Sequence, residues 1–112
     1  MAASVGPVSA EGAEAEARRI LAAALDGGGW LWHRCADSRR CRGAAGLPDF
    51  VAVHPAGGPA LAVEVKGPRT RVSPAQRRWL DALGAAGIDA RLVRGRAEAA
   101  ELARSLSAGP LG

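Results

Sequence analysis

The sequence contains little lysine, few aromatic residues and few cysteines. Of its 15 basic residues only Lys66 is a lysine, and the others are arginines. Tyrosine is missing, so the aromatic residues are three tryptophans and Phe50. The two cysteines, Cys35 and Cys41, are too few for a disulfide scaffold, and we expect them to be reduced. These shortages argue against a small secreted disulfide domain, and they single out Lys66.

Long apolar runs are missing as well. No stretch approaches the roughly 18 apolar residues that a membrane span needs, and no basic stretch followed by an apolar run opens the chain. We therefore expect a cytoplasmic protein with no membrane partner. The 112 residues suffice for one domain with a modest core. We expect a flexible tail over residues 1–10 and a single domain over residues 11–112.

Basic residues exceed acidic ones. The net charge is +4 and the sequence pI is about 10.4, which favours a polyanionic partner, most commonly nucleic acid. An arginine-rich composition that only reflects coding bias is the alternative, because charge alone does not identify a partner.

The pattern of apolar residues and of glycine and proline predicts helices alternating with strands. Ser73, Pro74 and Gln76 stand where the N-cap, first and third residues of a helix with a capping box belong. The chain is therefore expected to form an α/β domain of order α-β-β-β-α-β-α. The expected elements are helix 11–25, strands 30–34, 49–54 and 60–66, helix 74–86, strand 88–94 and helix 97–106.

The second and third strands are expected to form a hairpin that carries Asp49, Glu64 and Lys66. If the hairpin pairs symmetrically about Gly57 and Gly58, Asp49 faces Lys66. Paired residues, and residues two apart on one strand, point to the same side of a sheet. All three side chains would then share one face at the open end of the hairpin, although a slip by one residue would remove Asp49 from it.

Two carboxylates beside apolar strands repel each other, and a divalent cation removes that cost. Oxygen ligands completed by water suit Mg²⁺ or Mn²⁺, which can activate water and neutralise charge on a scissile phosphate. The compact ammonium of Lys66 fits beside such water or phosphate better than a planar guanidinium does. The alternative is structural: Asp49 caps a turn, Glu64 ends a solvated strand and Lys66 pairs with one of them.

The same residues resemble the PD-(D/E)XK nuclease superfamily, and more narrowly the VRR-NUC family of small phage and bacterial nucleases. The resemblance runs from about Glu14 to Arg94, with a slightly longer segment over residues 41–45 as its departure. It rests on an ordered set of motifs: Gly29-Trp30, Gly46-Leu47-Pro48-Asp49, Glu64-Val65-Lys66 and Ser73-Pro74-Ala75-Gln76-Arg77-Arg78-Trp79-Leu80.

The resemblance implies a restriction-endonuclease-like core, a mixed sheet flanked by helices, and Mg²⁺-dependent hydrolysis of DNA phosphodiesters. It implies Asp49 and Glu64 as metal ligands, joined by the backbone carbonyl of Val65. It also implies Lys66 as the catalytic lysine.

Three further positions come from the resemblance or lie near it. Glu14 is expected to complete the metal shell from the first helix, with Glu16 as the competing candidate. Gln76 matches a glutamine of the family, and its place in the capping box explains it equally well. His33 is a candidate for contact with DNA or with the acid of the first helix.

The sequence is therefore interpreted as a Mg²⁺- or Mn²⁺-dependent DNA endonuclease, with structure-specific roles in replication, recombination or repair left open. Cutting both strands needs two sites, which is consistent with a homodimer. The alternatives are a non-catalytic DNA-binding module that keeps the fold and a basic partner-binding protein whose triad is coincidental. Five arginines on two loops are expected to contact DNA phosphates: Arg39, Arg40, Arg42, Arg69 and Arg71.

Overall fold

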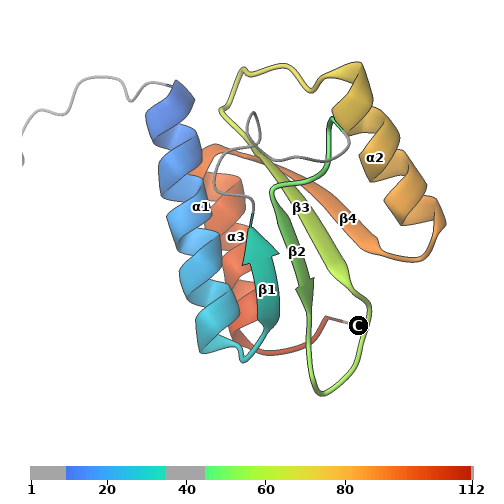
Figure 1. Cartoon of the computed structure of the whole chain (residues 1–112). Helices are drawn as coiled ribbons and strands as arrows, with labels where there is room; N and C mark the ends of the chain where they lie inside the picture. The colour runs from blue at the N-terminus through green and yellow to red at the C-terminus, as the bar shows by residue number, and fades with distance from the viewer. Residues whose placement is uncertain (1–9, 35–44, 112) are drawn as a thin grey trace, which may run out of the picture.

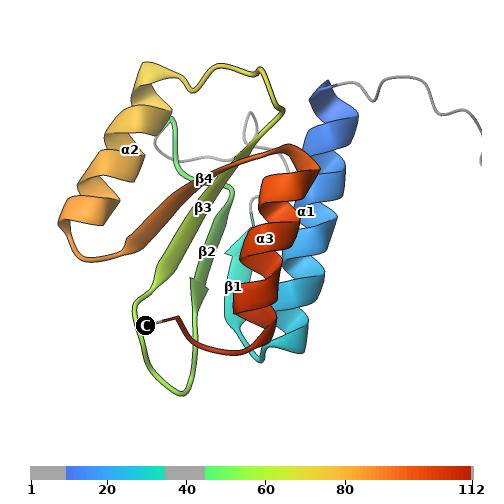
Figure 2. The ribbon, with the colours of Figure 1, turned by 180° about the vertical axis from the view of Figure 1, so that it is seen from behind.

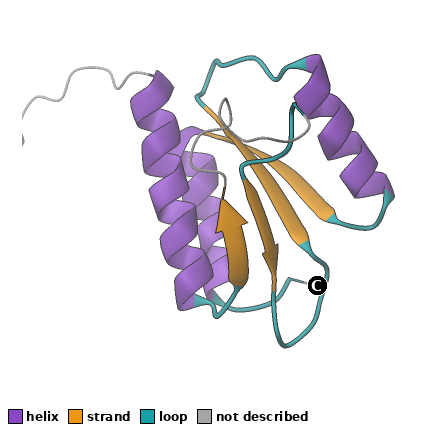
Figure 3. Cartoon of the chain, in the orientation of Figure 1, coloured by secondary structure: helices purple, strands orange, loops and turns teal. Residues whose placement is uncertain are grey.

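The computed structural model describes residues 10–34 and 45–111 (Figure 1). Residues 1–9 of the tail expected over residues 1–10 lie outside the described residues, as do the predicted DNA contacts Arg39, Arg40 and Arg42. The predicted order of helices and strands is confirmed (Figure 3). The elements are α1 (Ala10–Gly27), β1 (Leu31–Arg34), β2 (Phe50–Val53), β3 (Leu61–Lys66), α2 (Pro74–Ala85), β4 (Asp89–Arg94) and α3 (Gly95–Ser107).

The helix ends differ slightly from the prediction. Helix α1 begins at Ala10, inside the expected tail, and continues to Gly27, because the amide of Gly28 still donates to the carbonyl of Ala24 at 2.9 Å. Helix α3 begins at Gly95 rather than at Ala97. Within residues 10–34 and 45–111, none of the helices combines the length and the apolarity that crossing a membrane demands.

The four strands form one mixed sheet in the order β1-β2-β3-β4. Strand β2 pairs antiparallel with both β1 and β3, and β4 runs parallel to β3. Parallel neighbours need a crossover, and α2 supplies it between β3 and β4. The mixed sheet flanked by helices is therefore confirmed.

Helices cover both faces of this sheet. Helices α1 and α3 lie side by side on one face, as Figures 1 and 2 show from opposite directions. Val63 and Val65 of β3 point into that face and are buried in one core with Leu21 of α1. Strand alternation sends Glu64 to the other face, where Gln76 of α2 reaches it with a hydrogen bond of 3.1 Å. Helix α2 therefore covers the part of the second face formed by β3 and β4, whereas Val51 and Val53 of β2 stay exposed on that face.

The core closes at the end of the molecule where α1 leads into β1. The indole of Trp30 donates to the carbonyl of Leu106 at 2.9 Å, which ties the last turn of α3 to the start of β1. Gly28 is required there, because an added Cβ would lie 2.0 Å from the same carbonyl oxygen. The polar residues Asp49, Glu64 and Lys66 lie at the opposite end of the sheet.

The predicted register of the β2–β3 hairpin is wrong by two residues. Phe50 pairs with Val63 and Ala52 with Leu61, so the register continues to Asp49 opposite Glu64 rather than opposite Lys66. The cause is the turn: the amide of Gly57 donates to the carbonyl of His54 at 2.9 Å, so the chain reverses at Pro55 and Ala56, before the two glycines.

A shift by two residues preserves the faces of a strand, whereas a shift by one exchanges them. Asp49, Glu64 and Lys66 therefore lie on one face even though the assumed pairing is wrong.

Candidate active site

The open end of β2 and β3 brings Asp49, Glu64 and Lys66 together. Both carboxylates are nearly inaccessible, with Asp49 at 8% and Glu64 at 4% of full exposure. Strand β2 starts only at Phe50, so the amide of Val65 finds its acceptor in Oδ2 of Asp49, at 2.7 Å. This bond fixes one carboxylate oxygen of Asp49 against β3.

Glu64 is held by two neighbours on its own face. The side-chain amide of Gln76 donates to its Oε1 at 3.1 Å, and Nζ of Lys66 lies 4.0 Å from the same oxygen. Burial, and then the charge of Asp49, raise the pKa of Glu64 from 4.5 to about 8. A side-chain hydrogen bond with Asp49 adds to the rise, and the charges of Lys66 and Arg18 lower this pKa without offsetting it. Burial and the charge of Asp49 therefore favour the protonated form of Glu64 when no further cation is present.

Gln76 performs both roles that its sequence position suggested. Its Oε1 accepts from the backbone amide of Ser73 at 2.9 Å. Its own backbone amide donates to Oγ of Ser73 at 3.1 Å, which completes the capping box. Its Nε2 is left to donate to Glu64. The capping box thus fixes the side chain whose other end orients a carboxylate of the site.

Helix α1 contributes an ion pair to the edge of the site. Oε1 of Glu14 accepts from the amide of Gly67 at 3.0 Å, and its Oε2 pairs with Arg18 at 3.1 Å. Arg18 also lies 3.9 Å from Oδ1 of Asp49. Glu16 instead pairs with Arg96 at 3.4 Å. Of the two candidate acids on α1, only Glu14 has described contacts with the turn after β3 and, through Arg18, with Asp49.

The carboxylates suit a divalent cation that keeps much of its water. Within the described part of the chain, no group of three or more His, Cys, Asp and Glu side chains is placed to hold a metal ion. Mg²⁺, however, is commonly bound by one or two carboxylates with water in the other positions. Asp49 and Glu64 supply such a pair, and added positive charge there would favour the ionised form of Glu64, whose pKa is raised by burial and by the charge of Asp49. The donor set therefore fits Mg²⁺ or Mn²⁺.

Two of the predicted DNA-contacting arginines are described, and both are exposed. Arg69 and Arg71 lie in the loop between β3 and α2, close in sequence to the site. Arg94 of β4 donates to the carbonyl of Thr70 at 2.6 Å and so holds this loop against the sheet. His33 is exposed on β1, where it pairs with Val51 on the face that carries Glu64.

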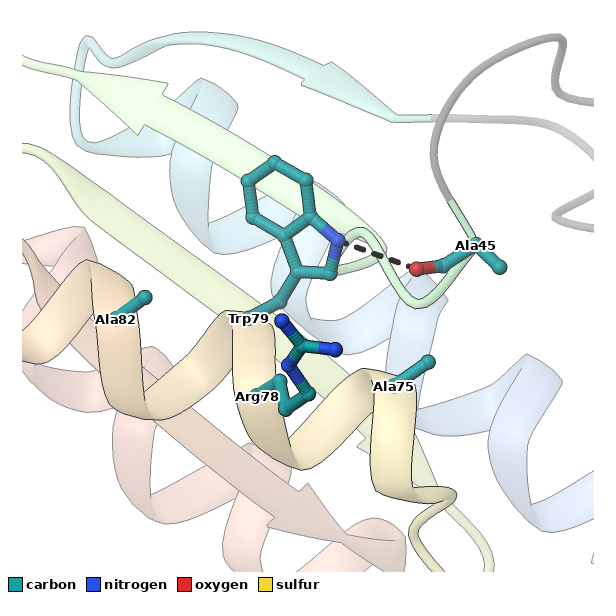
Figure 4. A pocket seen from close by; sticks show the side chains of 5 residues that line it. All are labelled: Ala45, Ala75, Arg78, Trp79 and Ala82. Carbon is teal, nitrogen blue, oxygen red and sulfur yellow. Dashed lines mark hydrogen bonds between the residues drawn. The ribbon is translucent and has the colours of Figure 1, made fainter.

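A cavity of about 420 Å³ opens beside α2 rather than over the carboxylates (Figure 4). The indole nitrogen of Trp79 donates to the carbonyl of Ala45 at 3.1 Å, so Trp79 joins α2 to the segment that leads to Asp49. Gly46 passes close to the first turn of α2, since an added Cβ would lie 2.5 Å from the backbone of Ala75. Together these contacts position Asp49 relative to Gln76.

Arg18 and Arg94 were not predicted as site residues from the sequence. Arg18 stands four residues after Glu14, the spacing that brings side chains together on a helix, and this was the available signal. Nothing in the sequence signals the contact of Arg94, because it joins a strand end to a loop 24 residues earlier.

Comparison with known proteins adds an independent observation. Residues 7–97 match the model of the VRR-NUC domain family. Fanconi-associated nuclease 1 from Danio rerio is 43% identical over 68 residues, and that from Ailuropoda melanoleuca is 48% identical over 54 residues. These matches cover 61% and 48% of this chain but only 7% and 5% of the relatives, so the chain spans a small part of them.

Two solved structures share the fold. One, described as a VRR_NUC domain protein, has a TM-score of 0.61 and 16% identity over 89% of this chain and 93% of its own. The other, described as a VRR_NUC domain, has a TM-score of 0.62 and 22% identity over 83% of this chain and 91% of its own.

Proposed function

Because the chain belongs to the VRR-NUC domain family, we propose that it is a DNA nuclease that hydrolyses phosphodiester bonds with Mg²⁺ or Mn²⁺. The observation that carries the proposal is the meeting of Asp49, Glu64 and Lys66 at one end of the sheet, with both carboxylates buried. Its similarity to proteins named Fanconi-associated nuclease 1 supports the same activity.

In the proposed reaction, Asp49 and Glu64 hold the cation, with the carbonyl of Val65 as the further ligand that the family resemblance implies. A divalent cation in this place supplies charge neutralisation at the scissile phosphate and an activated water. Val65 fixes Asp49 through its amide, and Gln76 fixes Glu64, so both carboxylates are oriented before the substrate arrives.

Lys66 carries the positive charge that faces the substrate. Its side chain is 14% exposed, and its ammonium lies 4.0 Å from Oε1 of Glu64. At this distance the two charges attract each other, but they form no direct hydrogen bond. A compact ammonium in this position stabilises negative charge that develops on the phosphate oxygens. Water is the nucleophile in this scheme, and no covalent enzyme intermediate forms.

DNA is the proposed partner. The chain carries a net charge of +4, and Arg69 and Arg71 are exposed in the loop that follows Lys66 in the sequence. Contacts of such arginines with phosphates give an affinity that falls as the salt concentration rises. Because one site cuts one strand, the proposal extends to a homodimer for double-strand cleavage.

The test is cleavage of supercoiled plasmid and of branched DNA in Mg²⁺, in Mn²⁺ and in EDTA. Wild type should cut with either metal and not in EDTA, whereas Asp49→Ala and Lys66→Ala should each lose activity at least 100-fold, the usual cost of removing a charge-stabilising group. Arg104→Gln, which removes a charge from the last turn of α3, is the control and should cut like wild type.

Circular dichroism of all the variants separates loss of chemistry from loss of fold. DNA binding without cleavage, across both metals and all substrates, would instead identify a non-catalytic DNA-binding module. Cleavage that survives in both alanine variants would reject the site.

A further inference from the structure

Arg18 stands between the two acidic groups at the edge of the site. Its Nη2 lies 3.1 Å from Oε2 of Glu14 and 3.9 Å from Oδ1 of Asp49. Its side chain is 25% exposed, and that of Asp49 is 8% exposed. A guanidinium cation therefore already lies next to a carboxylate on which the proposed metal would bind.

We propose that Arg18 is the resident cation of this site, and that a divalent metal displaces it from Asp49. The proposal rests on the proposed function, in which Asp49 and Glu64 hold the metal. Arg18 acts through Asp49 and is thus a positioning residue. In the metal-free protein it offsets part of the repulsion between the carboxylates, and the metal takes over this role when it binds.

The two oxygens of Asp49 differ in a way that supports the exchange. Oδ2 is fixed by the amide of Val65 at 2.7 Å, so Oδ1 is the oxygen that is turned toward Arg18. The distance of 3.9 Å is too long for a hydrogen bond, and only charge attraction holds Arg18 to Asp49. Mg²⁺ binds oxygen at about 2.0–2.1 Å, and its charge is double, so it competes effectively for Oδ1.

Arg18 stays at the site after the metal displaces it from Asp49. Its shorter ion pair is with Glu14, whose other oxygen accepts from the amide of Gly67 at 3.0 Å. Glu14 therefore keeps the guanidinium near the turn that follows Lys66. The remaining interaction between Arg18 and the metal is a repulsion, which lowers the affinity of the wild-type site for cations.

The size of this repulsion sets the expected effect. Even at the dielectric constant of water, a single and a double positive charge about 6 Å apart repel by an energy that corresponds to roughly a tenfold change in affinity. The carboxylates of the site are nearly inaccessible to solvent, where this repulsion is stronger, so removal of the charge of Arg18 should strengthen metal binding by about tenfold or more. A role of Arg18 as a structural support for Asp49 predicts the opposite sign, because a misplaced carboxylate binds metal more weakly.

The first measurement is the affinity for Mn²⁺, by isothermal titration calorimetry on the DNA-free protein. Arg18→Gln should bind Mn²⁺ more tightly than wild type by about tenfold or more, whereas Arg18→Lys, which keeps the charge, should stay within about threefold. Arg104→Gln has the same change in net charge as Arg18→Gln but lies in the last turn of α3, and it should match wild type. Unchanged or weaker binding by Arg18→Gln overturns the proposal.

The second measurement needs no metal. In EDTA at pH 8, Arg18→Gln should unfold at a lower temperature than wild type and than Arg104→Gln, because the carboxylates lose their counter-charge. Saturating Mn²⁺ should remove most of this difference. Equal melting temperatures of wild type and Arg18→Gln in EDTA overturn the counter-charge role.

The two measurements separate this proposal from the proposed function. If wild type binds no Mn²⁺, the metal site itself is wrong, the displacement is rejected with it, and the EDTA melt alone decides whether Arg18 is a counter-charge. If wild type binds Mn²⁺ and Arg18→Gln does not bind it more tightly, the metal site stands and only the role of Arg18 fails.

Discussion

The two sides of strand β3 are both largely hidden from solvent, but they differ chemically. Leu61, Val63 and Val65 point toward α1 and α3 and are at most 1% exposed. On the other side, Glu64 is 4% exposed, and Lys66 follows it at the strand end. The same six-residue strand thus buries branched apolar side chains on one side, and on the other it carries a buried carboxylate and a partly buried lysine.

The apolar residues of β3 stabilise the fold, whereas the buried carboxylate on its other side lowers the stability of the fold. Burial of an apolar side chain contributes about 1.5–3 kcal/mol to folding. A buried carboxylate costs free energy unless it is paired and hydrogen-bonded, and Glu64 is only partly compensated by Gln76 and Lys66. The apolar side of β3 therefore provides the stability that lets the other side keep a strained carboxylate pair.

The largest expected effect on stability belongs to the apolar side. Leu61→Ala should lower the free energy of unfolding by about 2–5 kcal/mol, because Leu61 is fully buried and its removal leaves a cavity. Urea denaturation measures this loss. In the absence of urea, where the variant is folded, its affinity for Mn²⁺ should equal that of wild type. A loss of metal binding in the folded variant would show that the two sides are not independent.

Lys66→Arg tests the polar side without changing its charge. The wider, planar guanidinium should not fit where the ammonium lies, so the cleavage rate should fall about 100-fold, or about 2.7 kcal/mol of transition-state stabilisation. Single-turnover cleavage with saturating enzyme measures the rate, and the melting temperature serves as the control for the fold. A rate near that of wild type would mean that the site requires only a positive charge.

The pH dependence of stability tests the strain on Glu64. Its pKa in the folded protein, about 8, is above the ordinary value of 4.5, so the folded state binds more protons than the unfolded state between these values. In EDTA the free energy of unfolding of wild type should thus fall as pH rises from about 4.5 to 8, by on the order of 1–3 kcal/mol.

Glu64→Gln is the matched variant, because it removes the titrating proton and keeps the shape of the side chain. Its stability should change less over this pH range, and at pH 8 it should exceed that of wild type. Saturating Mn²⁺ should raise the stability of wild type at pH 8, and it should raise that of Glu64→Gln by a smaller amount. If the stability of the two proteins depended on pH in the same way, the raised pKa of Glu64 would be contradicted.

The smallest expected effect separates the two roles of Gln76. Ser73→Ala and Gln76→Ala each disrupt the capping box and should each lower stability by about 1 kcal/mol. Only Gln76→Ala also removes the donor to Glu64, and it should reduce the cleavage rate about tenfold, whereas Ser73→Ala should cut like wild type. Equal activities of the two variants would limit Gln76 to its local role.

Local patterns in the sequence predicted the elements well. The capping box at Ser73 is confirmed because its bonds lie within one helical turn. The shared face of Asp49 and Glu64 followed from strand alternation, which tolerates an error of two in register. The register itself was wrong, because two adjacent glycines gave a more obvious turn than Pro55 and Ala56.

Contacts between distant segments were beyond such patterns. The sequence offered Glu14 and Glu16 as alternatives, and only the packing of α1 against the end of β3 gave Glu14 its contact with Gly67. The contact of Arg18 with Asp49 was missed for the same reason, since Asp49 lies just before β2, 31 residues after Arg18 in the sequence.

The sequence by itself determined the order of helices and strands, the face that carries the three site residues, and the family resemblance, because each depends on periodicity or on short motifs. The tertiary structure decided which oxygen of Asp49 is fixed, which acid of α1 borders the site, and that Arg18 lies beside Asp49. These depend on how β3 meets α1 and α2 in space, and burial at that junction, rather than any local pattern, raises the pKa of Glu64.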